Sequence, residues 1–268
     1  MAQTAITERQ AKFVLTIDRF ALAVAQHWLA YMNVVFGAFV IAPIFSPAFM
    51  AIGWTGPAEA IYSFYGILCH QLPERSFFLF GHKTSYSLAE ISRAYSFDNI
   101  LALRQFIGNE AMGWKMAWSD RMVALYGSLW LGGLLFALFR RRLPCLSWVA
   151  WVLLGILPLG VDGFSHMIND AVAGISGTGF RDTNVWLQGL TGNILPAKFY
   201  AGDALGSFNN LARLVTGTLT GLTTVWFLYP FVDSAMRDIV QISQSRLASP
   251  RAVELGLAPQ TTRMEPRR

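Results

Sequence analysis

Charged residues are scarce in this sequence, and their scarcity argues against a soluble globular protein. Only 14% of the 268 residues are charged, whereas 54% are hydrophobic and the mean hydropathy is +0.41. A soluble domain carries about 25% charged residues, so this chain lacks the polar surface that would cover it in water. We therefore expect an all-α polytopic membrane helical bundle, integral to the cytoplasmic membrane of a prokaryote and in contact with the lipid bilayer.

Cysteine is nearly absent, and the features of a cleaved leader are missing. Cys69 and Cys145 are expected on opposite sides of the membrane, which makes a disulfide between them unfavourable. Asp18 and Arg19 interrupt the hydrophobic stretch that a secretory signal peptide requires. Residues 1–27 are instead expected to form an amphipathic N-terminal segment at the membrane interface.

A nucleic-acid-binding stripe is also missing, although the net charge is +5. The excess positive charge lies in Arg140, Arg141, Arg142 and residues 237–268, without the stacking aromatic residues of a strand-binding groove. Positive residues mark the cytoplasmic side of short membrane loops. We therefore expect no nucleic-acid partner, a cytoplasmic arginine loop, and a disordered cytoplasmic tail at residues 248–268.

Long apolar segments dominate what is present. A membrane-spanning helix needs about 20 apolar residues, and the transmembrane domain expected at 28–247 contains five apolar segments, at 28–49, 58–72, 116–139, 148–167 and 208–232. The second segment would extend only about 22 Å as a helix, short of a hydrocarbon core about 30 Å thick. The sequence thus predicts either four spans plus a half-helix, with the N-terminus inside, or five spans, with the N-terminus outside.

Four polar patterns interrupt the apolar segments and are expected at one extracytoplasmic membrane face. Because a charge at membrane depth costs several kcal/mol unless it is paired or hydrated, we expect the arginines to face the acidic residues. Such pairs either lock helix ends together or form a ligand site. The candidate cluster comprises Cys69, His70, Gln71, Glu74, Arg75, Asp120, Arg121, Asp162, His166, Asn210 and Arg213.

These patterns resemble the signature of a family of small predicted integral membrane proteins of unknown function. The matching motifs are Cys69-His-Gln-Leu-Pro-Glu-Arg-Ser76, Pro158-Leu-Gly-Val-Asp162-Gly163 and Asn210-Leu-Ala-Arg213-Leu-Val-Thr216-Gly217. Two departures stand out: Ser119 and Met122 replace the cysteines of the family's Cys-x-Arg-Cys pair, and His166 replaces a usual glutamine. The resemblance implies a membrane helical fold but no activity.

The family's three cysteines and one histidine would suit zinc. Here the remaining candidates for metal ligands are Cys69, His70, Met122 and His166, which are too few and too mixed for a closed structural zinc site. A copper or haem-iron site is the alternative that they leave open. The sequence therefore identifies no cofactor.

Two functions remain open from the sequence. The first is an accessory or assembly subunit of a membrane complex, with other membrane-protein subunits as partners. The second is a small membrane enzyme or transporter, in which Arg121 and Arg213 hold an anionic group and His70 or Asp162 moves a proton. We favour the first, because the chain lacks a complete catalytic set. A cavity beside the polar cluster would favour the second.

Overall fold

The computed structural model describes residues 8–139, 144–250 and 254–255. The arginine loop at 140–142 and most of the tail at 248–268 lie outside the described residues, as do residues 1–7. The chain divides into two compact units, one formed by residues 33–227 and the other by residues 1–32 with 228–268.

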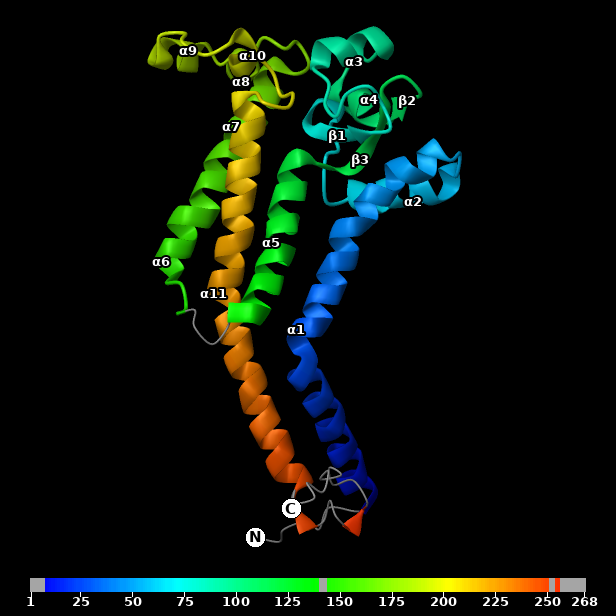
Figure 1. Ribbon diagram of the computed structural model, residues 1–268, viewed down its shortest axis with the longest axis vertical. Coiled ribbons are helices and arrows are strands. Elements are labelled where there is room, and N and C mark those ends of the chain that lie inside the picture. Colours follow the sequence, from blue (N-terminus) through cyan, green and yellow to red (C-terminus); the bar gives the residue numbers. More distant parts are fainter. Residues whose placement is uncertain (1–7, 140–143, 251–253, 256–268) are drawn as a thin grey trace, which may run out of the picture. The chain divides into compact units, whose positions relative to one another are not determined.

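Four helices are long and apolar enough to cross a membrane, which confirms the helical fold class. They are α1 (Glu8–Ala51), α5 (Asp120–Phe139), the continuous stretch 148–173, and α11 (Phe208–Leu247). The segment 58–72 does not form a fifth. It overlaps α2 (Thr55–Gly66), whose 12 residues would extend about 18 Å, and in Figure 1 this helix runs across the direction of α1.

The helices α5 and α11 approach closely because glycines line their contact. A Cβ atom on Gly221 would lie 2.1 Å from Ser128 Oγ, and one on Gly217 would lie 2.8 Å from the Arg121 carbonyl oxygen. Only residues without side chains permit this approach, and small residues are typical of such contacts between membrane helices. The glycines of the Gly217-x-x-x-Gly221 motif therefore allow the polar N-terminal ends of α5 and α11 to lie close together.

The stretch 148–173 is interrupted by a π-helical turn. It consists of α6 (Trp148–Trp151), η2 (Val152–Ile156) and α7 (Leu157–Ala173). Pro158 has no backbone N–H, so the regular hydrogen bond to the carbonyl four residues earlier is missing. At the same turn, Thr220 donates from Oγ1 to the Gly155 carbonyl at 2.9 Å. The carbonyl group at this turn thus forms a hydrogen bond between the stretch 148–173 and α11.

A small sheet and two short helices lie at one end of the long helices of this unit (Figure 1). The antiparallel strands β1 (Ser76–Leu79), β3 (Gly113–Ser119) and β2 (Gly108–Asn109) pair in that order. They pack with η1 (Pro73–Arg75), α3 (Leu88–Ala94) and α4 (Ile100–Gln105). Their core contains Leu72, Phe78, Tyr86, Ile91, Leu103, Phe106 and Met112. Sequence analysis did not predict the sheet.

The Gly-rich connection before α11 also folds locally. It contains α8 (Phe180–Thr183), α9 (Val185–Thr191) and α10 (Ala197–Tyr200). The buried amide of Asn184 donates to the carbonyls of Arg181 and Tyr200, both at 2.7 Å, and Asn209 donates to the Arg181 carbonyl at 2.6 Å. These amides hold the connection against the start of α11.

In the other unit, the beginning of α1 pairs with the end of α11. Leu15 and Leu247 form a buried contact, Trp28 meets Tyr229 edge to face, and Asp18 lies 3.3 Å from an Arg246 nitrogen. Residues 8–19, expected within a separate surface segment, are the first turns of α1.

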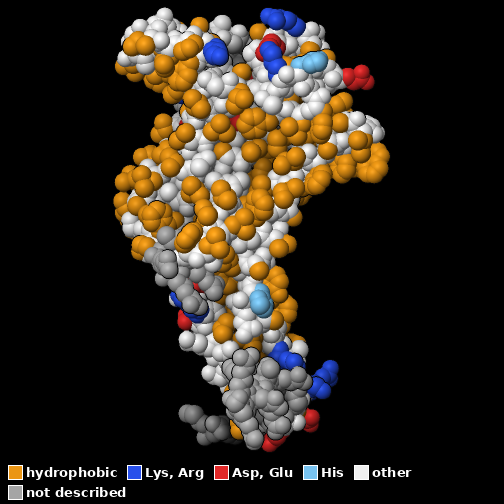
Figure 2. Space-filling model, in the orientation of Figure 1, with side chains coloured by type: hydrophobic (Ala, Val, Ile, Leu, Met, Phe, Trp, Pro, Cys, Tyr) orange, Lys and Arg blue, Asp and Glu red, His pale blue; other side chains and the backbone are white. Residues whose placement is uncertain are grey.

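Hydrophobic side chains cover the long helices on the face in Figure 2, whereas charged side chains gather over the sheet end of the 33–227 unit. Large apolar residues on these helices are strongly exposed, among them Leu138 at 76% and Phe164 at 64%. Exposed apolar surface of this extent is typical of a protein that interacts with lipid or with another protein.

Candidate functional site

The first charged group of the site joins α5, α11 and the connection between α10 and α11. Arg213 is 2% exposed and donates from Nε and Nη2 to the Asp120 carboxylate at 2.8 and 2.7 Å. Its Nη1 donates to Asp203 at 2.6 Å. Asn210 adds a bond to Asp120 at 2.7 Å. This confirms the expected pairing of Arg213 with an acidic residue, and each nitrogen of the guanidinium has an acceptor.

The same carboxylate of Asp203 links this group to Arg75. Arg75 binds Asp170 through two bonds of 2.8 and 2.7 Å, and its Nε donates to Asp203 at 2.8 Å. Although burial acts to raise it, the pKa of Asp203 is held below its ordinary value by Arg75 and Arg213. Asp203 therefore remains ionised and links η1 to α11.

The second charged group centres on Asp162 in α7. Arg121 Nη2 donates to Asp162 at 2.8 Å, as the sequence predicted, and Arg181 Nη2 donates to its other oxygen at 2.7 Å. Arg181 Nη2 also lies 3.0 Å from His166 Nε2. A guanidinium can only donate, so Nε2 accepts and the neutral ring carries its proton on Nδ1.

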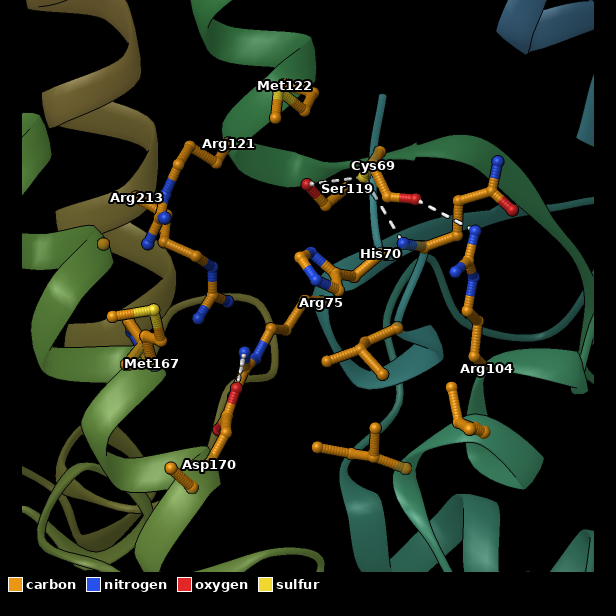
Figure 3. A pocket seen from close by; sticks show the side chains of 17 residues that line it. Cys69, His70, Arg75, Arg104, Ser119, Arg121, Met122, Met167, Asp170 and Arg213 are labelled. Atoms are coloured by element: carbon orange, nitrogen blue, oxygen red, sulfur yellow. Dashed lines mark hydrogen bonds and ion pairs between the residues drawn. The ribbon is translucent and has the colours of Figure 1, made fainter. Parts of the chain in front are cut away.

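A cavity of about 540 Å³ opens beside both groups. Figure 3 shows Arg121, Arg213 and Met167 on one side of it and Cys69, His70 and Ser119 on the other. Its lining combines cationic, polar and apolar side chains, including Leu72, Arg75, Ile100, Leu101, Arg104, Met122, His166 and Asp170. Pockets of about 300–1,000 Å³ with apolar walls and a few polar groups are the usual sites for small ligands.

Two buried donors at this cavity have no acceptor among the described residues. They are His166 Nδ1 and Arg121 Nε, and the whole His166 side chain is 4% exposed. A buried donor without a partner destabilises the fold, so such atoms are rare in folded proteins. Both residues line the cavity. They make this side of the cavity suited to an acceptor or an anion.

The Cys69-His70-Gln71 motif lies in the turn after α2, not on a helix. The buried thiol of Cys69 lies 3.5 Å from Ser119 Oγ and accepts from the Gln71 amide at 3.4 Å. Gln71 has a φ of 52° and donates from Nε2 to the carbonyls of Tyr62 and Ala117 at 3.0 and 2.8 Å. Gln71 thus fixes the turn, and His70 remains exposed beside the cavity.

The proposed metal ligands line the cavity but do not form a compact cluster. In the described part of the chain, no group of three or more His, Cys, Asp or Glu residues is placed to hold a metal ion. Cys69, His70, Met122 and His166 all border the cavity, and they come from the turn after α2, from α5 and from α7.

Glu74 does not border this cavity and lies beside a buried lysine that sequence analysis missed. Glu74 is 6% exposed, Arg75 Nε is 3.9 Å from its Oε1, and its Oε2 has no hydrogen-bond partner among the described residues. Burial raises the pKa of Glu74 to about 7.

Lys115 on β3 is 1% exposed and donates to the carbonyls of Gln71 and Arg104 at 2.7 and 2.6 Å. Burial lowers the pKa of Lys115 to about 7.

The structure therefore brings the predicted residues other than Glu74 to the cavity or to the two charged groups beside it, and it adds three charged residues to the ion pairs of these groups. Asp120 and Asp162 do not line the cavity but bind Arg213 and Arg121, which do, and Asn210 donates to Asp120. The missed residues, Asp170, Arg181 and Asp203, lie at the end of α7 and in the connection to α11. The sequence signal that could have identified them is the presence of charged residues in this glycine-rich connection.

Comparison with known proteins gives one distant relative. The chain is 22% identical over 201 residues to an uncharacterized protein of Methanocaldococcus jannaschii, and the alignment covers 72% of this chain and 84% of that protein. No family model matches the chain, and no solved structure matches it. The name of this relative gives no activity.

Proposed function

We propose that this chain is an integral membrane protein that binds the anionic group of an amphiphilic ligand in the cavity bordered by Arg121 and His166. The observation that carries the proposal is that two residues bordering the cavity, Arg121 and His166, each have a buried N–H donor without an acceptor among the described residues. Anions that accept from a guanidinium form short, charge-assisted hydrogen bonds. A carboxylate or a phosphate would supply the missing acceptors.

The apolar part of the cavity lining supports a ligand that also has an apolar portion. Leu72, Ile100, Leu101, Met122 and Met167 border the same cavity as the arginines. A small inorganic anion would leave these side chains uncovered. An amphiphile, such as a lipid-like molecule, would bind the arginines through its anionic group and cover the apolar side chains with its hydrocarbon part.

The four long apolar helices support a place in the bilayer. In the proposed orientation, the positive residues of the 140–142 loop and of the C-terminal tail face the cytoplasm. The cavity then lies at the extracytoplasmic ends of α5, α7 and α11, where a ligand could enter from the lipid headgroup region. Contact with the lipid bilayer is part of this proposal.

The proposal differs from the function that the sequence favoured. The sequence left the choice between an accessory subunit and a ligand site to the packing of the polar cluster, and the cluster borders a cavity. One observation still favours the role of an accessory subunit, because part of the polar cluster is used for structure. Arg75 and Arg213 bind carboxylates and act as structural ties. A stoichiometric membrane partner in native mass measurements would support that role, and a chain that purifies alone would contradict it.

Binding of decyl phosphate to the detergent-purified chain tests the anion site. We expect saturable binding by calorimetry, with decanol bound at least about tenfold more weakly, because a neutral alcohol offers no charge to Arg121. Arg121→Gln should weaken decyl phosphate binding by at least about tenfold, while Asp162 keeps its bond to Arg181.

The matched control is Arg93→Gln, which removes an exposed arginine from α3. This variant should bind decyl phosphate as the wild type does. Equal affinity for decyl phosphate and decanol, or an unchanged affinity in Arg121→Gln, would contradict the proposed site.

A further inference from the structure

A second cavity, separate from the proposed anion site, occupies about 470 Å³ on the sheet side of the molecule. The two cavities share four lining residues, so these form the wall between them: Leu72, Arg75, Ile100 and Asp170. The second cavity differs in charge. It is lined by four carboxylates, from Glu74, Asp170, Asp182 and Asp203, and by the single guanidinium of Arg75.

Arg75 does not neutralise this lining. Its close bonds go to Asp170 and Asp203. The Asp182 carboxylate accepts from the Gly179 amide at 2.9 Å and from the Asn169 side chain at 3.2 Å, and both of these donors are neutral. Asp182 therefore has only neutral hydrogen-bond donors in the described part of the chain, and Glu74 lies 3.9 Å from Arg75 Nε without a hydrogen bond to it.

Glu74 gives the second, independent indication of a ligand. The side chain is 8% exposed, and its Oε2 accepts no hydrogen bond from any described residue. Arg75 Nε is 3.9 Å from the other carboxylate oxygen, which is too long for a hydrogen bond. A buried carboxylate that is left without donors costs free energy, and a donor brought by a ligand would recover it.

The apolar wall decides what kind of cation fits. Leu88, Phe97, Ile100, Leu103 and Ile175 line the same cavity. A metal ion would need several closely grouped ligands, and the described residues contain no such group of three. An organic ammonium ion meets both requirements, because its charged end donates hydrogen bonds and its carbon body covers apolar side chains such as Phe97.

We propose that the second cavity is a binding site for a small organic ammonium ion, whose charged end binds on the side of Glu74 and Asp182 and whose apolar body packs against Phe97 and Ile175. The proposed ammonium site rests on other unpartnered residues than the proposed anion site, since Glu74 lines only the second cavity and Arg121 lines only the first. An amine with an aryl or short alkyl group matches the cavity in charge and chemistry.

The test uses 2-phenylethylammonium and its neutral analogue 2-phenylethanol with the full detergent-purified chain. We expect saturable binding of the ammonium by calorimetry and at least about tenfold weaker binding of the alcohol, since only the ammonium bears a charge. Glu74→Gln should weaken ammonium binding by at least about tenfold, because it removes the charge and keeps the shape of the side chain. Equal binding of the two compounds would overturn the proposal.

Two controls separate this site from general effects. Glu110→Gln removes an exposed carboxylate outside the cavity, and Arg121→Gln alters only the anion site. Both should bind the ammonium as the wild type does, so failure of the anion proposal leaves this result unaffected. Unchanged affinity in Glu74→Gln would contradict the site.

A further variant keeps the proposal testable if Glu74→Gln does not fold. Ile175→Lys places an ammonium of the chain's own in the cavity, and Ile175 is only partly buried. This variant should compete with 2-phenylethylammonium and lower its affinity, whereas Ile175→Met should not. An Ile175→Lys variant that binds the compound as tightly as wild type would also contradict the site.

Discussion

Arg213 and Arg121 both bind a carboxylate near the end of a long helix, yet their surroundings differ. Arg213 is 2% exposed and divides its hydrogen bonds between Asp120 and Asp203. The Arg121 side chain is 20% exposed, shares Asp162 with Arg181, and leaves Nε without an acceptor. The comparison separates two uses of one residue type. A guanidinium with its donors occupied holds helices together, and one with a free donor beside a cavity can bind a ligand.

The largest effect is expected from removing the saturated arginine. Arg213→Met would leave Asp120 and Asp203 buried without their shared cation, and breaking a buried pair in this way costs about 3–5 kcal/mol. Thermal unfolding in detergent should show a much lower midpoint or a failure to fold. Arg213→Lys should recover only part of the loss, because one ammonium cannot replace the fork of bonds. A wild-type midpoint in Arg213→Met would remove the distinction between the two arginines.

The next largest loss of stability is expected from a change in the distance between α5 and α11. Gly221→Val would place side-chain atoms against Ser128, where a Cβ alone would lie 2.1 Å from Oγ. Overpacking of this kind costs about 1–3 kcal/mol, and it would shift Asp120 relative to Arg213. Gly127→Val is the matched control, since a Cβ there meets nothing within 4 Å. Equal unfolding midpoints for the two variants would show that the helices are not held at this distance.

Glu74 should give a pH dependence that neither arginine gives. Its pKa rises from 4.5 to about 7 on folding because it is buried, so the folded state retains a proton that the unfolded state has lost in this window. The stability contributed by this group is present below pH 4.5 and is lost as the pH rises to about 7. Glu74→Gln should therefore flatten the fall in unfolding midpoint between about pH 5 and about pH 7. Identical pH profiles would contradict the assignment.

The smallest effect on stability is expected at the unsaturated arginine. In Arg121→Gln, Asp162 keeps its 2.7 Å bond to Arg181, so no carboxylate is left without a cation. We expect a loss below about 1 kcal/mol, the range of a partly exposed ion pair, together with the loss of anion binding. An unfolding midpoint as low as that of Arg213→Met would place Arg121 among the structural ties.

The pairing of the arginines could be predicted because it follows from a strong physical constraint. Arg121 and Arg213 lie at the ends of apolar segments, where an unpaired charge is costly, and the nearby acidic residues are few. The partners Asp170 and Asp203 could not be assigned in the same way. They lie at the ends of a glycine-rich connection, and its path over the helix ends depends on turns such as Asn184, whose φ is 45°.

The sheet and the length of α2 were missed for different reasons. The strands β2 and β1 contain two and four residues, which is too short for an alternating pattern to be recognised. The end of the seven-residue strand β3 was included in the apolar segment 116–139, whose helix begins only at Asp120. In the segment 58–72, the apolar run continues past the end of the helix. The helix ends at Gly66, and Gln71 takes a left-handed conformation to turn the chain back toward the sheet. The hydrophobicity of the segment alone does not predict that turn.

The wall shared by the two cavities makes their occupancies interdependent. Arg75 and Asp170 face each other through two hydrogen bonds, and each of them lines both cavities. An anion that attracts Arg75 from one side would free the Asp170 carboxylate for a cation on the other. By thermodynamic linkage, a cation bound beside Asp170 would strengthen anion binding by the same factor. From this geometry we expect the two proposed ligands, an anion and a cation, to bind with positive cooperativity.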